Sequence, residues 1–119
     1  MEYNEDVKGN VVVSEDVVSS IANLAATEVE GVAHLHHGIT GGIAEKFGKK
    51  SGSKGVRVVR SDDELIIDLY VDVDFGVQVQ ETAEKVQRKV KTTVEAMTGT
   101  RVIQVNVNVD GVRMKATID

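Results

Sequence analysis

Three groups of residues have side chains that could do chemistry, and the first is the triplet His34, His36 and His37. Imidazole nitrogens bind divalent metals, and His34 and His36 would share one face of an extended segment. Zinc normally takes three or four protein ligands, however, and the chain contains no cysteine. A polar loop flanked by glycine is the favoured interpretation. We therefore assign no metal ligand and no cofactor, and leave metal binding by the triplet open.

A row of aspartates, Asp68, Asp72 and Asp74, is the second group. Same-face neighbours on a strand lie about 7 Å apart, close enough to share a hard cation such as calcium, and paired acids also serve glycosidases. An open sheet face is polar in any case, and the sequence indicates no flanking substrate cleft. A solvated face, or a surface that binds a partner, is therefore favoured over a catalytic site.

The third group is a glycine-rich basic segment. Residues 45–60 carry six cations against one acid, a local charge of +5 in a chain whose total is −5. Residues 42–50 loosely resemble a Walker-type phosphate loop, but the glycine spacing is one residue too long, and Lys50 stands where Ser or Thr would hold magnesium. We exclude nucleotide hydrolysis, and a solvated loop is the favoured interpretation. An electrostatic contact with a protein partner, nucleic acid or anionic lipid stays open, because the charge split favours an oriented contact. Its candidate residues are Lys46, Lys49, Lys50, Lys54 and Arg57.

Composition limits the classes of function. A chain of 119 residues is about one domain, and we expect one over residues 1–119, with a core over about 7–112, flexible tails and a mobile loop over about 38–55. Aromatic residues make up only 3%, so little material exists for stacking on nucleic-acid bases. The start of the chain is acidic and no apolar run is long enough to span a membrane. We expect a cytoplasmic protein that inserts into no membrane itself.

Apolar periodicity predicts the elements that position these groups. Alternation predicts strands over residues 7–13, 56–60, 65–75 and 103–110, and three- and four-residue spacing predicts helices over 14–29 and 77–97. The order strand, helix, strand, strand, helix, strand indicates an α+β two-layer sandwich with both helices on one face of a small, mostly antiparallel sheet. A ferredoxin-like arrangement is the simplest solution, and other topologies with this order remain open.

Several segments together form a recognisable pattern through their order and spacing: Ile21-Ala22, Ala25-Ala26, Glu28 to Val32, Tyr70 to Gly76, Val86-Gln87, Val90-Lys91, Val94-Glu95, Met97 to Gly99, Val102, Val105 to Val109 and Gly111-Val112. This pattern resembles the alkaline-shock-protein envelope stress response family of Gram-positive bacteria. The resemblance implies a non-enzymatic cytoplasmic protein of cell-envelope homeostasis. It also implies that some members are held at the membrane by a membrane-spanning relative and that some are tied to fatty-acid supply.

The leading hypothesis is therefore a non-catalytic interaction module. It would assemble with itself or bind a membrane-anchored relative, using the basic segment, the aspartate face, or both. The alternative is a nucleic-acid-binding regulator that uses the glycine-rich basic loop. The acidic isoelectric point, about 5.2, and the few aromatic residues count against that alternative.

Overall fold

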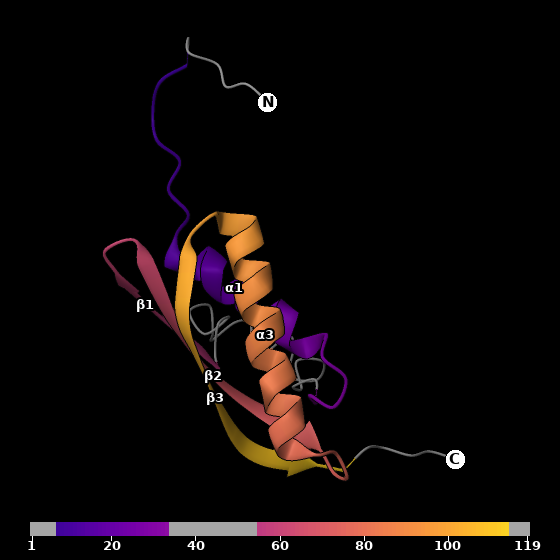
Figure 1. Cartoon of the computed structure of the whole chain (residues 1–119). Helices are drawn as coiled ribbons and strands as arrows, with labels where there is room; N and C mark the ends of the chain where they lie inside the picture. The colour runs from indigo at the N-terminus through magenta and orange to yellow at the C-terminus, as the bar shows by residue number, and fades with distance from the viewer. Residues whose placement is uncertain (1–6, 34–54, 115–119) are drawn as a thin grey trace, which may run out of the picture.

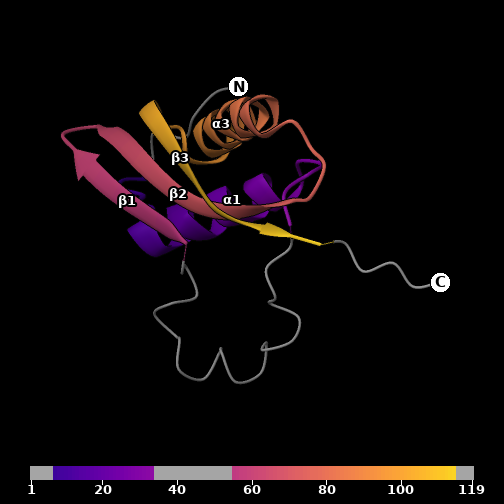
Figure 2. The same ribbon diagram turned by 90° about the horizontal axis from the view of Figure 1, so that it is seen from below.

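The computed structural model describes residues 7–33 and 55–114, which form two helices and three strands. The elements are, in chain order, α1 (Glu15–Thr27), β1 (Val56–Ser61), β2 (Glu64–Asp74), α3 (Val79–Thr98) and β3 (Arg101–Arg113). Figure 1 shows both helices against the sheet, and Figure 2 shows β2 between β1 and β3. The predicted α+β class with two layers is confirmed.

The sheet is mixed rather than mostly antiparallel. β1 and β2 form an antiparallel hairpin, whose turn places the non-glycine residue Asp62 at φ 61°, a conformation that aspartate tolerates. β2 and β3 pair in parallel over the longer register, from Glu64 opposite Arg101 to Asp74 opposite Arg113. The parallel direction arises because α3 returns the chain across the sheet between these two strands.

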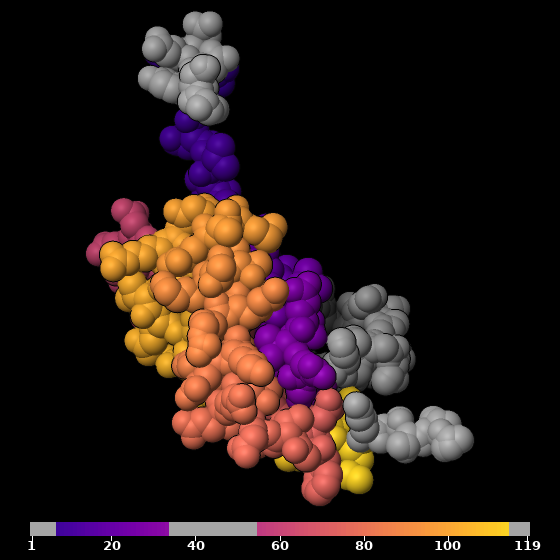
Figure 3. Space-filling view, turned by 45° about the vertical axis from the view of Figure 1, so that its right-hand side comes forward, coloured from indigo at the N-terminus to yellow at the C-terminus, as the bar shows by residue number. Residues whose placement is uncertain are grey.

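The predicted first strand, residues 7–13, is wrong as an element of this sheet. These residues lie in no helix or strand, and in Figure 3 they project from one end of the body. Val11 and Val12 are 93% and 82% exposed. Val11, Val12 and Val13 are consecutive, so they do not alternate, and only Val13 packs against the core. Without this strand between them, β2 and β3 pair directly.

One hydrophobic core joins both helices to a single face of the sheet. On β2 the alternation holds as predicted, because Leu65, Ile67 and Leu69 are almost fully buried. On α3, the buried valines Val86, Val90 and Val94 are four residues apart and form one apolar stripe that faces the sheet. The remaining members of the buried cluster come from α1, from the segment after it, and from β3: Val18, Ala22, Ala25, Ala26, Val32, Val102 and Val105.

The helix ends follow the expected chemistry. The Ser14 side chain accepts a hydrogen bond from the backbone N–H of Val17 at 3.2 Å and so caps the start of α1. Gly99 ends α3 in the left-handed conformation at φ 76°. Gly31, at φ 103°, follows α1 where a side chain would come within 3.3 Å of Thr82 and Val77. Glycine at this position lets the chain turn close against α3.

Candidate interaction surface

The face of the sheet opposite the helices is covered by no element among residues 7–33 and 55–114. It carries an apolar and aromatic centre, because Val59 of β1 lies opposite Ile66 of β2 and Tyr70 follows on β2. Tyr70 and Val59 are 45% and 44% exposed. We call these three residues and their polar neighbours Arg57, Asp68, Asn106 and Asn108 the open face.

Two predicted site residues meet on the open face. Arg57 lies opposite Asp68 in the ladder between β1 and β2. Asp68 also lies opposite Asn106 of β3, and its carboxylate Oδ1 accepts a hydrogen bond from Asn106 Nδ2 at 2.7 Å. Because Asn106 holds the Asp68 carboxylate in this way, the carboxylate has a defined position toward a molecule that binds this face.

The other two aspartates do not join Asp68 in one site. Asp72 lies opposite Gly111 after a register shift, and its Oδ1 would be 2.8 Å from a Cβ at that glycine. Asp74 lies opposite Arg113 at the far end of the ladder, and its backbone N–H donates to the Gly31 carbonyl at 2.8 Å. Among the described residues no three His, Cys, Asp or Glu side chains form a group that could hold a metal ion. The row is therefore a series of separate contacts rather than a shared cation site.

The predicted basic contact has five candidate residues, and only Arg57 belongs to the described part of the chain. Lys46, Lys49, Lys50 and Lys54 lie outside the described residues, as do His34, His36 and His37. Of the six cations in residues 45–60, the structure places Arg57 on the open face and Arg60 beside the start of α1. Arg60 donates to the Val13 carbonyl at 3.0 Å and lies 4.0 Å from the Glu15 carboxylate. Arg60 is thus occupied in holding the residues before α1.

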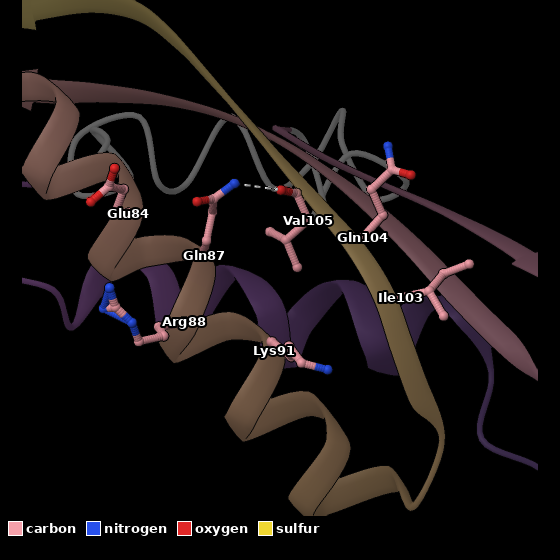
Figure 4. A pocket seen from close by; sticks show the side chains of 7 residues that line it. All are labelled: Glu84, Gln87, Arg88, Lys91, Ile103, Gln104 and Val105. Atoms are coloured by element: carbon pink, nitrogen blue, oxygen red, sulfur yellow. Dashed lines mark hydrogen bonds between the residues drawn. The ribbon is translucent and has the colours of Figure 1, made fainter.

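A shallow groove of about 370 Å³ lies between α3 and β3. In Figure 4 the Gln87 side chain reaches from α3 to β3, where it donates to the Val105 carbonyl at 3.0 Å. Lys91 donates to the Val102 carbonyl at 3.0 Å. The lining residues, completed by Glu84, Arg88, Ile103 and Gln104, include no histidine or nucleophilic hydroxyl. Gln87 and Lys91 thus hold the first half of β3 against α3.

Sequence reasoning missed this set of edge contacts. Glu95 adds to it, because its Oε2 accepts from the Val102 N–H at 2.8 Å and from Lys91 Nζ at 2.9 Å. These two hydrogen bonds lower the pKa of Glu95 below its usual value. The available signal was the placement of Gln87, Lys91 and Glu95 four residues apart on α3. Such spacing puts side chains on one helix face, but it does not tell which strand edge they meet.

Comparison with known proteins adds the family. Residues 3–114 match the model of the alkaline-shock-protein 23 family, which is described as having a cell envelope-related function. The chain belongs to this family. Two relatives come from Bacillus subtilis. YqhY is 34% identical over 113 residues, which cover 95% of this chain and 84% of the relative, and YloU is 34% identical over 89% of this chain and 90% of the relative. Both are called uncharacterized, and the predicted alkaline-shock-type membership is confirmed.

A third relative, Spy1535 of Streptococcus pyogenes, is 34% identical and covers 92% of this chain and 83% of its own length. Among solved structures, the H285A form of MamM-CTD superposes with a TM-score of 0.51 at 17% identity, covering 82% of this chain and 98% of that one. At this identity the likeness concerns the fold alone. No helix in the described part of the chain is long and apolar enough to cross a membrane.

Proposed function

We propose that this member of the alkaline-shock-protein family is a non-catalytic cytoplasmic module of cell-envelope homeostasis that binds protein partners through the open face. The partner would be a second copy or a membrane-anchored member of the family. Membership in a family with a cell envelope-related function supports the envelope part of this proposal. The single observation that supports the binding part is the aromatic and apolar centre formed by Tyr70, Val59 and Ile66, which no helix or strand of the described residues covers.

The composition of the open face suits a protein interface. Interfaces are enriched in tyrosine and arginine, and their energy is concentrated in a few buried aromatic or arginine side chains within a polar rim. Here Tyr70 is the natural anchor, and Arg57, Asp68 and Asn108 supply the rim. Charges of both signs lie beside the centre, so they would favour one orientation of the partner and oppose others.

The surface also argues for contact rather than chemistry. Asp68 is engaged by Asn106, and no second ionisable group of the described residues is hydrogen-bonded to it. A general acid or base must lie within hydrogen-bond reach of the proton it transfers and is usually oriented by a further group. The two best-formed pockets among the described residues lie between α3 and β3 and beside the start of α1, and neither is lined by Tyr70, Val59 or Asp68.

Photo-crosslinking in Gram-positive cells tests the proposal. A crosslinking amino acid replaces Tyr70 in the full chain, and the same amino acid at Lys85, exposed on α3, is the matched control. The expected adduct at position 70 is a second copy of this chain or a membrane-anchored family member. Adducts at position 70 that are no more abundant than those at position 85 would contradict binding through the open face.

Nucleic-acid binding by the basic loop is an outcome of the same experiment. If the alternative holds, adducts at position 70 contain no protein, and a mobility shift at low salt disappears when Lys49, Lys50 and Lys54 are changed to alanine. No contact among the described residues favours this alternative, so it stays a prediction from the sequence.

A further inference from the structure

The residues before α1 form an N-terminal arm, residues 7–13, that has the composition of a strand but no strand partner. Val11 and Val12 are the two most exposed large apolar side chains among the described residues, at 93% and 82%. Three consecutive β-branched residues favour extended structure, and such exposed apolar side chains are unfavourable in water. The pattern therefore predicts a strand, although the sheet of the same molecule does not take it up.

We propose that the N-terminal arm adds as a strand to the outer edge of β3 in a second copy of this chain. This inference rests on the proposed function and specifies one partner within it, with a second surface for contact. Backbone hydrogen bonds of the added strand supply the affinity, and the side chains of alternate residues supply the specificity.

Among the described residues β3 is an edge strand, and another element bonds only its first half. Side chains of α3 bond the backbone of Val102 and Val105 on that half: Glu95, Lys91 and Gln87 supply these contacts. From residue 106 to residue 112, no described residue outside β2 and β3 is hydrogen-bonded to the strand. Edge strands present unpaired N–H and C=O groups and pair readily with another chain. We call residues 106–112 the open edge.

The same molecule cannot make this pairing. Ser14 and Arg60 fix the base of the arm at the start of α1, where Arg60 holds the Val13 carbonyl at 3.0 Å. In Figures 1 and 3 the arm leaves the body at the end where α3 finishes and β3 begins. The open edge lies toward the opposite end, and the nearer half of β3 is the half that α3 protects. The arm therefore reaches the open edge of β3 only in another molecule.

The two segments also carry opposite charges. Lys8 is the only charged residue of the arm, and Asp110, exposed on β3, is the only charged residue of the open edge. Opposite charges on neighbouring strands stabilise a pairing modestly.

Disulfide mapping tests the inference cleanly because the chain has no cysteine. Single variants Val11→Cys and Val12→Cys are each mixed with an isotopically heavy Asn108→Cys chain and mildly oxidised, and mixed disulfides are measured by mass spectrometry. Successive side chains of a strand point to opposite faces, so only one arm position should face the same side as residue 108. We expect that position to crosslink at least about tenfold more than the other.

The control is a heavy Val59→Cys chain, which places the cysteine on β1, the other edge of the sheet. Crosslinking to position 59 at a level equal to or above position 108 would overturn the assignment to β3. Equal crosslinking of positions 11 and 12 to position 108 would overturn the strand geometry. Absence of mixed disulfides with position 108 at either arm position would overturn the inference as a whole.

Sedimentation gives an independent measure that needs no cysteine. The wild-type chain should associate with rising concentration, and the double variant Val11→Asp, Val12→Asp should associate at least about tenfold more weakly. Leu24→Asp, which changes an exposed apolar residue on α1, is the matched control and should associate like the wild type. A wild type that stays monomeric, or an arm variant that associates unchanged, would contradict arm exchange. If sedimentation contradicts arm exchange but photo-crosslinks at position 70 are still found, only this inference is overturned and the proposed function is not.

Discussion

The Glu95 carboxylate of α3 accepts a hydrogen bond from the backbone N–H of Val102, 2.8 Å away, at the start of β3. Lys91 completes the arrangement, since its Nζ lies 2.9 Å from the same carboxylate and 3.0 Å from the Val102 carbonyl. One residue of an edge strand thus has both its N–H and its C=O satisfied by two side chains of the preceding helix. This contact fixes the turn from α3 into β3 and closes that part of the edge to other strands.

The first prediction concerns the pH dependence of stability. The pKa of Glu95 is lowered from 4.5 in the folded chain by the Val102 hydrogen bond and by Lys91. A lowered folded-state pKa means that the carboxylate stabilises the fold fully above the unfolded value, and that this contribution is lost as the pH falls through the folded value. Glu95→Gln should therefore reduce the free energy of unfolding at about pH 7, with a smaller difference from wild type at about pH 3.

Urea unfolding of both proteins at the two pH values measures this effect. Glu30→Gln, a change of an exposed carboxylate just after α1, is the control and should alter stability little at either pH. An equal loss of stability for Glu95→Gln at both pH values would show that the carboxylate charge plays no part in the contact.

The second prediction concerns the pair on the open face. Asn106 Nδ2 donates to Asp68 Oδ1 at 2.7 Å in a partly buried position. Changing Asn106 to alanine removes the donor, so we expect the free energy of unfolding to fall by about 1 kcal/mol. A double-mutant cycle with Asp68→Ala should give a coupling energy of about 0.5–1.5 kcal/mol. Additive single effects would mean that the two side chains act independently.

The third prediction uses two glycines with similar backbone conformations. Gly31 and Gly76 have φ values of 103° and 100°, which strain any residue with a Cβ. At Gly31 a Cβ would also lie 3.3 Å from Thr82 and Val77, whereas nothing lies within 4 Å at Gly76. Gly31→Ala should therefore lower the midpoint of thermal unfolding more than Gly76→Ala, because it adds crowding to the same backbone strain. Equal shifts would show that α3 yields without cost at this contact.

Local patterns predicted the two layers well where burial follows a simple period. Alternation identified β2, whose Leu65, Ile67 and Leu69 are buried, and the three- and four-residue spacing identified α3 to within two residues of each end. Alternation fails at Ile103, which has the same phase as Val105 and Val107 but is 45% exposed, because a register shift between β2 and β3 displaces it. A β-bulge changes which residues face the core, and periodicity alone does not reveal one.

Contacts between distant segments were beyond local patterns. Phe75 continues the buried alternation of β2 but is 68% exposed, because β2 has ended and no described element covers it. Leu24 fits the apolar stripe of α1, yet the buried face is centred on Ala22, Ala25 and Ala26, which let α1 approach its neighbours closely. The open face was predicted from the aspartates, whereas its aromatic and apolar centre depends on which residues of β1 lie opposite β2.

The most direct measurement of the central claim is recovery of envelope partners by the full chain and its variants from the membrane fraction of Gram-positive cells. Tyr70→Asp places a charge at the centre of the open face, and Leu24→Asp makes the same kind of change on α1. We predict that Tyr70→Asp recovers at least about tenfold less of a membrane-anchored family member than the wild type, while Leu24→Asp recovers as much. Equal recovery by Tyr70→Asp and the wild type would contradict partner binding through this face.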